Sequence, residues 1–152
     1  MAMAPRKGDG SGPRVQKKSG DRVEQIVHLV EDAFNRHEDW KIEEAVGDHF
    51  LDHSTSWGGV SFRERARIVR TMLEDPKLEI HELMVWGNLV ASKWSLTGRH
   101  TGKLLGFEPT GRELTITGIA VDRLKDGRSV EHWELPDLDK LTEELAEYQK
   151  AG

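Results

Sequence analysis

Four side chains at strand-like positions of this chain could together transfer protons: His100, Asp122, His132 and Glu134. Imidazole and carboxyl groups act as acids and bases near neutral pH once burial and neighbouring charges adjust their pKa values. A carboxylate in line with buried residues costs free energy unless it is paired, protonated or used in catalysis. Simple ion pairing of Glu134 and His132, with each other or with arginine side chains, would meet the same requirement, and the residues alone leave both interpretations open.

The elements that must position these groups are strands. Runs of β-prone residues predict strands over residues 78–86, 89–99, 113–124 and 129–134. Gly87-Asn88 and Asp126-Gly127 predict tight turns between them, because glycine readily adopts the positive φ that such turns need. Residues 101–111 are expected to form a longer loop. An antiparallel meander of these strands would bring the four ionisable groups near one another.

Alternation of side chains along a strand predicts which of them share a face of the sheet. The apolar face of the second strand ends at His100, which places this ring at the edge of a pocket. That face consists of Val90, Ser92, Trp94, Leu96, Gly98 and His100. On the last strand, Val130, His132 and Glu134 share a face.

The opposite face is expected to serve a contact between two copies of the chain. Glu131 and Trp133 point away from Glu134 by the same alternation. The neighbouring strand contributes Lys93, Ser95, Thr97 and Arg99 to this face.

Amphipathic helices precede the strands, and a polar helix follows them. Apolar residues at three- and four-residue steps predict helices over residues 21–37, 40–50 and 61–75, with a last helix over 138–150. Asp21 and Ser61 are suitable N-caps, Glu64 completes a capping box, and Pro76 would stop the third helix. Helices followed by an antiparallel meander predict an α+β fold with helices on one face of a curved antiparallel sheet.

Composition limits the class of protein and its partners. The chain has 152 residues, a net charge of -5 and no cysteine, which excludes disulfides, thiol catalysis and cysteine-bound metals. Basic residues gather only in a tail of residues 1–20, which is expected to be disordered, so nucleic acid is not the expected partner. No apolar run reaches the roughly 18 residues that span a bilayer, and a cytoplasmic location is expected. Residues 21–150 are predicted to form one domain.

Several motifs in combination resemble the SnoaL-like polyketide cyclases, a family of the nuclear transport factor 2-like superfamily. The similarity is tightest at Gly98-Arg99-His100-Thr101-Gly102 and at Gly106-Phe107-Glu108-Pro109-Thr110-Gly111-Arg112. It continues through Glu131-His132-Trp133 to Pro136-Asp137 and covers residues 22–145. Each motif is weak alone, but the combination is specific to the family.

The resemblance implies a cone-shaped α+β barrel around an apolar pocket, assembled as a homodimer or higher homo-oligomer and working without a metal or an organic cofactor. The family's catalytic aspartate falls on Glu134, which is one methylene longer, and its pocket histidine falls on His100. A polar pocket residue that is often Asn falls on Asp52. A second family histidine falls on Ala120, which is a departure from the family pattern.

The expected function is therefore a cofactor-independent cyclase of polyketides or related apolar metabolites. In an aldol closure, Glu134 would take a proton α to a carbonyl and later protonate the alkoxide, with its pKa raised by burial. His100 would polarise the carbonyl or orient Glu134. The substrate-binding candidates are Asp52, His53, Trp57, Trp94, Asp122 and His132, and neither a metal site nor a nucleotide motif is expected.

Two alternatives stay open at this stage. Glu in place of Asp, and Ala in place of His, also fit an epoxide-opening cyclase or hydrolase, or a cofactor-free hydroxylase. Epoxide opening needs an acid at the epoxide oxygen and a base at the attacking hydroxyl. The same fold could instead bind a small molecule without converting it, because fold alone does not define function.

Overall fold

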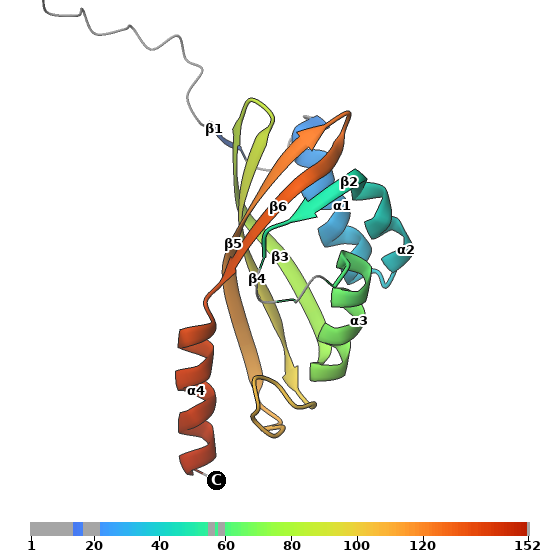
Figure 1. Ribbon diagram of the computed structural model, residues 1–152. Coiled ribbons are helices and arrows are strands. Elements are labelled where there is room, and N and C mark those ends of the chain that lie inside the picture. Colours follow the sequence, from blue (N-terminus) through green and yellow to red (C-terminus); the bar gives the residue numbers. More distant parts are fainter. Residues whose placement is uncertain (1–13, 17–21, 55–56, 58–59, 152) are drawn as a thin grey trace, which may run out of the picture.

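The computed structural model describes residues 14–16, 22–54, 57 and 60–151, and it shows the expected α+β fold on a curved sheet (Figure 1). The sheet has six strands in the order β1-β3-β4-β5-β6-β2. Its central strands form an antiparallel meander of β3 (Leu73–Trp86), β4 (Leu89–His100), β5 (Glu113–Lys125) and β6 (Arg128–Pro136). The strands and the order of elements therefore confirm the sequence prediction in its main features.

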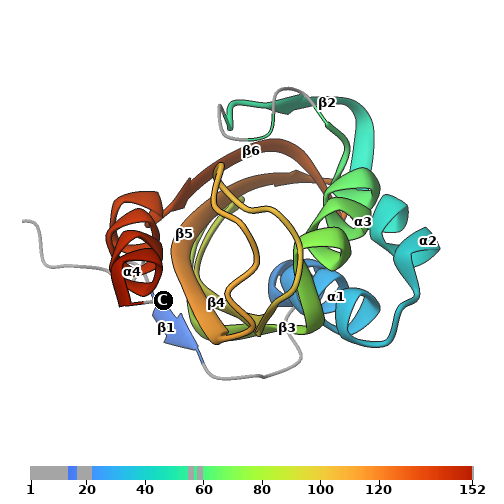
Figure 2. The same ribbon diagram turned by 90° about the horizontal axis from the view of Figure 1, so that it is seen from below.

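Helices cover the concave side of this sheet. Seen from below, the meander curves around the core while α1 (Arg22–Asn35) and α3 (Phe62–Met72) lie across its open side, with α2 (Asp39–Ile42) beyond them (Figure 2). The last helix, α4 (Leu138–Ala151), was expected to be polar throughout. It buries Leu141 and Leu145 against the same core as α3 and β5. Apolar side chains from the helices and the sheet thus pack together in the interior, where they form two clusters.

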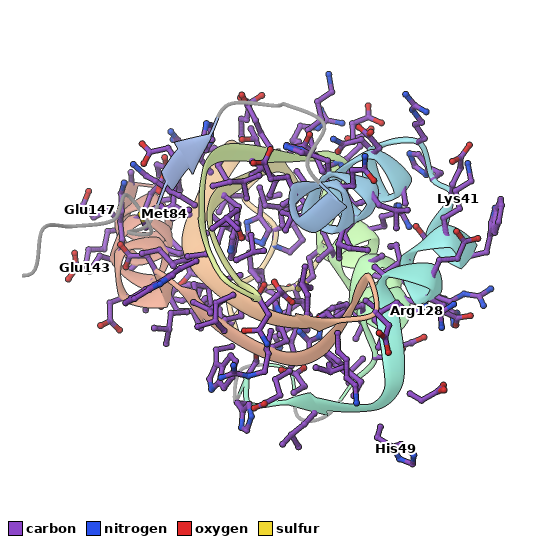
Figure 3. The ribbon with its side chains drawn as sticks, turned by 90° about the horizontal axis from the view of Figure 1, so that it is seen from above. Lys41, His49, Met84, Arg128, Glu143 and Glu147 are labelled. Atoms are coloured by element: carbon purple, nitrogen blue, oxygen red, sulfur yellow. The ribbon has the colours of Figure 1, made fainter. Side chains whose placement is uncertain are left out.

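Many charged side chains project from the outer surface. Viewed from above, side chains fill the space inside the curve of the sheet, while the labelled Lys41, His49, Arg128, Glu143 and Glu147 project around the outside (Figure 3). On β4, the predicted apolar face does point inward: Val90, Ser92, Trp94, Gly98 and His100 are all buried, whereas Lys93 and Arg99 are exposed. The alternation rule therefore predicted the inward face correctly.

The predicted turns are confirmed by their backbone. Gly87 has φ of 60°, and Asp126 and Gly127 have φ of 52° and 74° between β5 and β6. Two consecutive positive φ values are those of the tight hairpin turn for which Asp-Gly is preferred. This turn sets the register that pairs Asp122 with His132 and Ala120 with Glu134.

The predicted helix over residues 40–50 is wrong in its second half. Helix α2 continues only into a 3-10 turn, η1 (Glu43–Ala45), and the chain then forms β2 (Val46–Asp52), which pairs in parallel with β6. His49 has φ of 58°, a conformation outside any right-handed helix. Pairing with the edge of β6 outweighs the weak helical pattern, and the sheet is consequently mixed rather than wholly antiparallel.

Two other boundaries differ. Helix α3 ends at Met72, and β3 then begins at Leu73, so Pro76 lies at a bulge of the strand instead of stopping the helix. Ser61 does cap α3, because its hydroxyl accepts a hydrogen bond from the Glu64 amide at 3.2 Å. Within the predicted tail, β1 (Arg14–Gln16) pairs with β3; the rest of residues 1–20 and the proposed cap Asp21 lie outside the described residues.

Gly118 on β5 leaves the space that the Trp94 side chain occupies. It pairs with Trp94, and a Cβ at this position would lie 2.4 Å from Trp94 Cζ2 and 2.9 Å from the Leu135 carbonyl oxygen. We expect Gly118→Ala to lower the free energy of unfolding by about 1–3 kcal/mol, because the indole must leave its place in the core. Urea denaturation measures this change. The exposed Thr115→Ala on the same strand should change stability by at most about 0.5 kcal/mol, and equal effects of the two variants would contradict the account.

Candidate active site

A cavity of about 440 Å³ lies between the concave sheet and the helices. Most of its wall is apolar, with contributions from every long strand and from α1, α3 and α4. Polar side chains gather on one part of the wall: Arg65, Ser92, Asp122, Ser129, His132 and Glu134. A mostly apolar pocket with a few convergent polar groups is typical of a small-molecule site.

Strand register explains why these groups meet. Asp122 on β5 lies directly opposite His132 on β6, and Glu134 follows two residues later on the same inward face. Cross-strand neighbours of this kind have Cβ atoms within about 5.5 Å. The register set by the Asp126-Gly127 turn therefore brings two carboxylates and an imidazole together, and all three side chains project from the paired strands.

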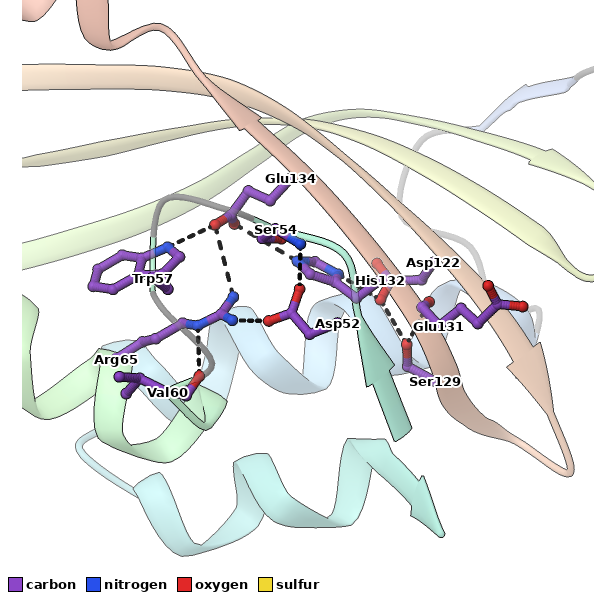
Figure 4. A network of polar contacts seen from close by, with 10 residues as sticks. All are labelled: Asp52, Ser54, Trp57, Val60, Arg65, Asp122, Ser129, Glu131, His132 and Glu134. Carbon is purple, nitrogen blue, oxygen red and sulfur yellow. Dashed lines mark hydrogen bonds and ion pairs between the residues drawn. The ribbon is translucent and has the colours of Figure 1, made fainter. Parts of the chain in front are cut away.

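Glu134 contacts two cationic groups and one neutral donor (Figure 4). Its Oε2 accepts a hydrogen bond from Trp57 Nε1 at 2.9 Å and lies 3.9 Å from Arg65 Nη1. Its Oε1 lies 3.9 Å from His132 Nε2, which is an ion-pair separation rather than a hydrogen bond. The carboxylate is thus surrounded by donors at the edge of an apolar cavity.

His132 is held by a buried carboxylate behind it. Its Nδ1 donates to Asp122 Oδ1 at 2.8 Å, and the Ser129 hydroxyl donates to the same oxygen at 2.7 Å. Burial alone would lower the pKa of His132, but its interactions with Asp122 and Glu134 outweigh burial and raise this pKa to about 9. His132 is therefore an imidazolium at neutral pH, with its Nε2–H facing Glu134.

The pKa of Glu134 departs from the expectation. Burial alone would raise it, as predicted from the sequence, but the neighbouring His132, Trp57 and Arg65 outweigh burial and hold the pKa of Glu134 below its usual value. Glu134 is a carboxylate at neutral pH. The site therefore does not contain a carboxyl with a raised pKa; it contains a carboxylate and an imidazolium whose nearest charged atoms lie 3.9 Å apart.

Arg65 is a site residue that the sequence analysis did not identify, and Ser129 beside Asp122 is another. Arg65 projects from α3, and its side chain is only 8% exposed. Nη2 donates to Asp52, and Nε donates to the Val60 carbonyl oxygen at 3.1 Å. Burial lowers the pKa of Arg65, and Glu134 partly offsets this effect. The signal was present in the sequence, because Arg65 lies on the apolar face of α3 next to Ala66, where a charged residue needs a buried partner.

The structure does not bring His100 to Glu134. Glu134 pairs with Ala120, which pairs with Ser92, and His100 lies eight residues farther along β4, roughly 25 Å away at the usual rise of a strand. His100 is fully buried, and its Nδ1 accepts a hydrogen bond from the Thr110 amide at 3.2 Å. It anchors the loop of residues 101–111 and does not line the cavity, so the predicted partnership with Glu134 is wrong.

The other predicted residues divide into two groups. Trp57, Trp94, Asp122 and His132 line the cavity, as expected of substrate-binding residues. Asp52 does not line it, because its carboxylate pairs with Arg65 and accepts from the Ser54 amide at 2.8 Å.

His53 lies on the outside of the sheet. Its ring stacks on Trp133 with centroids 4.7 Å apart, and its Nε2 lies 3.0 Å from Glu131. His53, which was expected to bind substrate, therefore does not line this cavity. The predicted outward orientation of Glu131 and Trp133 is confirmed.

Neither a metal cluster nor a membrane helix was found in the part of the chain that the structure describes. No group of three or more His, Asp or Glu side chains is arranged to hold a metal ion among these residues. None of their helices is both long and apolar enough to cross a membrane.

A curved α+β sheet with a carboxylate and an imidazole in the wall of a largely apolar cavity is typical of a protein that binds a small molecule. The sequence matches the description "SnoaL-like polyketide cyclase" over residues 24–145. The chain belongs to the SnoaL-like polyketide cyclase family.

Two curated relatives are polyketide cyclases. The chain is 30% identical over 98 residues to the nogalonic acid methyl ester cyclase of Streptomyces nogalater, a match that covers 64% of this chain and 73% of the relative. It is 35% identical over 109 residues to the aklanonic acid methyl ester cyclase DnrD of Streptomyces peucetius, covering 72% of this chain and 64% of the relative.

Solved structures share the fold at lower identity. AclR from Streptomyces galilaeus, a proposed hydroxylase, superposes with a TM-score of 0.74 at 21% identity and covers 85% of this chain and 98% of its own. IdmH from Streptomyces antibioticus, a proposed polyketide cyclase, gives a TM-score of 0.71 at 22% identity and covers 83% of this chain and 99% of its own.

The pKa of His132 makes stability depend on pH. A folded-state pKa of about 9 against an ordinary value of 6.5 means that the folded protein binds the proton more tightly than the unfolded chain. This stabilisation, on the order of 3 kcal/mol, is complete below pH 6.5 and is lost as pH rises to about 9. We expect the free energy of unfolding to fall across this range, and NMR titration should show the His132 ring protonated at pH 7.5.

Asp122→Asn should reduce the change in the free energy of unfolding with pH, because it removes the buried negative charge that is hydrogen-bonded to His132. The exposed Asp139→Asn on α4 is the control and should leave the slope unchanged. A His132 ring that titrates near 6.5 in the parent protein would contradict the assignment.

Proposed function

We propose that the protein is a cofactor-independent cyclase that closes a ring by acid–base catalysis, with Glu134 as the base and His132 as the acid. The observation that carries this proposal is the pair itself. A carboxylate and an imidazolium face each other across 3.9 Å in the wall of an apolar cavity. General acid–base catalysis requires both forms to be present at the working pH, and the two pKa shifts supply them.

In an aldol closure, Glu134 removes a proton from the carbon α to a carbonyl of the substrate. The resulting enolate attacks a second carbonyl of the same molecule, and the alkoxide takes a proton from His132 Nε2. The proton on Glu134 then returns to His132, which restores both groups. The cavity holds the flexible substrate in a conformation close to that of one ring. Part of the entropic cost of ring closure is therefore met when the substrate binds.

The names of the relatives indicate the substrate class. Nogalonic acid methyl ester and aklanonic acid methyl ester are the compounds in the names of the two cyclases. We infer that this chain acts on a related polyketide ester, and these two compounds are the first to assay.

Epoxide opening is the second candidate, because His132 is already an acid before the reaction begins. An imidazolium could protonate the epoxide oxygen while Glu134 takes the proton of the attacking hydroxyl or water. Product mass separates the candidates: internal ring closure conserves the mass of the substrate, hydrolysis adds a water, and hydroxylation adds an oxygen atom. A protein that only binds would show a saturable ligand and no product.

Replacing Glu134 tests the proposal directly. Glu134→Gln should lower kcat by about 10²–10⁴-fold, since the amide cannot accept the proton, and should leave binding nearly unchanged. Formation of the ring-closed isomer is followed by chromatography and mass spectrometry in buffer that contains a chelator, because the proposed mechanism needs no metal. In the parent, kcat should decrease above about pH 9 as His132 loses its proton.

Glu131→Gln is a matched control on the same strand. Glu131 faces outward and pairs with His53 and Arg123, so its replacement should leave kcat unchanged. If Glu134→Gln turns over like the parent while Asp52→Asn is inactive, the base is misassigned.

We also propose that the protein is a homodimer joined through the outer face of the sheet. Ile119 and Leu135 are cross-strand neighbours there and are 53% and 76% exposed. Met84, which lies on the outside of the sheet in Figure 3, continues the apolar surface across Ala91 and Val121 to Trp133. Exposed apolar surface that spans neighbouring strands is typical of a protein interface.

Light scattering at micromolar concentration should give twice the chain mass of 17.2 kDa. Leu135→Lys should shift the mass to that of the monomer, because an ammonium at the centre of the contact would lose its hydration. The control Glu143→Lys, on the outer side of α4, should stay dimeric. A monomeric parent would remove this proposal.

A further inference from the structure

Three nitrogens in the cavity wall have no hydrogen-bond partner. Among the cavity-lining side chains that the structure describes, Arg65 Nη1, Trp94 Nε1 and His132 Nε2 are buried and unsatisfied. Buried donors are nearly always hydrogen-bonded in folded proteins, so donors left open around a cavity indicate acceptor atoms on its ligand. Of the three residues, Arg65 gives the strongest evidence for a ligand acceptor, because it also lies next to the proposed base Glu134.

The guanidinium of Arg65 is held so that Nη1 has no hydrogen-bond partner, although it lies within ion-pair distance of Glu134. Nη2 and Nε are committed to Asp52 and to the Val60 carbonyl oxygen. The guanidinium carbon lies 4.9 Å from the centre of the Phe62 ring and 5.5 Å from the centre of the Trp57 ring. A side chain fixed from three sides loses little further freedom when it binds a ligand.

We propose that Arg65 Nη1 binds the carbonyl oxygen of the substrate unit that Glu134 deprotonates, and that it stabilises the enolate formed there. The inference rests on the proposed function and adds a catalytic residue to it. Nη1 lies 3.9 Å from Glu134 Oε2. A carbonyl oxygen and its α-carbon are about 2.4 Å apart by standard bond lengths, so this donor and this base can reach one carbonyl unit together.

The step conserves atoms and charge. Glu134 takes the α-hydrogen as a proton, the C–H electron pair becomes the carbon–carbon double bond, and the carbonyl π pair moves onto the oxygen. That oxygen gains negative charge while it accepts a hydrogen bond from Arg65 Nη1. A donor preorganised at the atom where charge develops lowers the barrier more than it favours the neutral substrate.

The surrounding charges favour an uncharged carbonyl over an anion as the bound group. Two cations, Arg65 and His132, face the three carboxylates Asp52, Asp122 and Glu134. A ligand carboxylate beside Arg65 would add a fourth negative charge next to Glu134. An enolate forms there only as Glu134 becomes neutral, so the total charge stays constant.

Naphthols test this site without turnover. The hydroxyl of 2-naphthol is an enol fixed in an apolar ring system, and 6-cyano-2-naphthol is the more acidic analogue, while naphthalene lacks the oxygen. Titration calorimetry should show affinity rising from naphthalene to 2-naphthol to 6-cyano-2-naphthol. Arg65→Lys should reduce this preference for the oxygen roughly tenfold or more, the usual effect of losing a hydrogen bond to a charged group, and should leave naphthalene binding unchanged.

A second variant separates Arg65 from the proposed base and does not depend on the stability of the first. Glu134→Gln resembles the neutral carboxyl present after proton transfer, so it should bind 6-cyano-2-naphthol more tightly than the parent does. The control Arg63→Lys, an exposed residue of the same helix that pairs with Glu43, should change nothing. Loss of the preference for the oxygen in Glu134→Gln, or its persistence in a folded Arg65→Lys, would overturn the inference.

The two proposals fail in different ways. In an active cyclase, Arg65→Lys should lower kcat by about 10²–10³-fold, as removal of one oxyanion donor does. If ring closure is insensitive to Arg65→Lys, the proposed oxygen site is wrong and the proposed cyclase activity stands. If the protein prefers naphthols but closes no ring, the oxygen site stands and the proposed cyclase activity is wrong.

Discussion

Compensation of buried charge is the constraint on which the rest of the site depends. The cavity wall buries Arg65, Asp122 and His132 almost completely and Glu134 largely. Each of these groups alone would cost several kcal/mol, and the cost is offset only because partners of opposite sign lie beside them. Each cation lies near two carboxylates, Arg65 near Asp52 and Glu134 and His132 near Asp122 and Glu134, so replacement of any carboxylate weakens the compensation of at least one buried cation.

Three parts of the chain that are distant in sequence must meet for this compensation. The hairpin of β5 and β6 supplies Asp122, His132 and Glu134, α3 supplies Arg65, and the end of β2 supplies Asp52. Parallel pairing of β2 with β6 places Asp52 opposite His132 in the register. The parallel strand, which the sequence did not suggest, is therefore what positions the carboxylate that holds Arg65.

Register within the hairpin is equally strict. A slip of one residue would turn His132 and Glu134 to the outer face and bring Glu131 and Trp133 inward. The Asp126-Gly127 turn and the bulge between Arg123 and Leu124 set the pairing at one end, and the inward apolar residues maintain it along the strands.

The sequence predicted the features that depend on local chemistry. Turns at Gly87 and Asp126-Gly127, the long strands and the inward face of β4 follow from glycine conformation and from alternation, and all of them are present. The helix over residues 40–50 was wrong because a short segment with a weak period takes its conformation from the strand beside it.

Site prediction failed where distance along a strand mattered. Alternation shows that His100 faces inward, but it does not show that the ring lies at the far end of a twelve-residue strand. His132 was included in the ionisable cluster but assigned to substrate binding, although its partner Asp122 is set by the turn. Arg65 was readable as a charge on an apolar helix face, but its partners Asp52 and Glu134 are 13 and 69 residues away in sequence and become neighbours only through folding.

The geometry also suggests why a glutamate can serve where an aspartate is expected. The longer side chain places Oε2 within reach of Trp57 Nε1 at 2.9 Å while Oε1 stays 3.9 Å from His132. In the proton abstraction proposed above, negative charge would move from this carboxylate to a substrate oxygen beside Arg65, which already faces the carboxylate. In the proposed mechanism, the charge would therefore travel a few ångströms between two positions near the same guanidinium. Because the surrounding dipoles and ions need not rearrange, most of the electrostatic cost of the enolate is met when the protein folds.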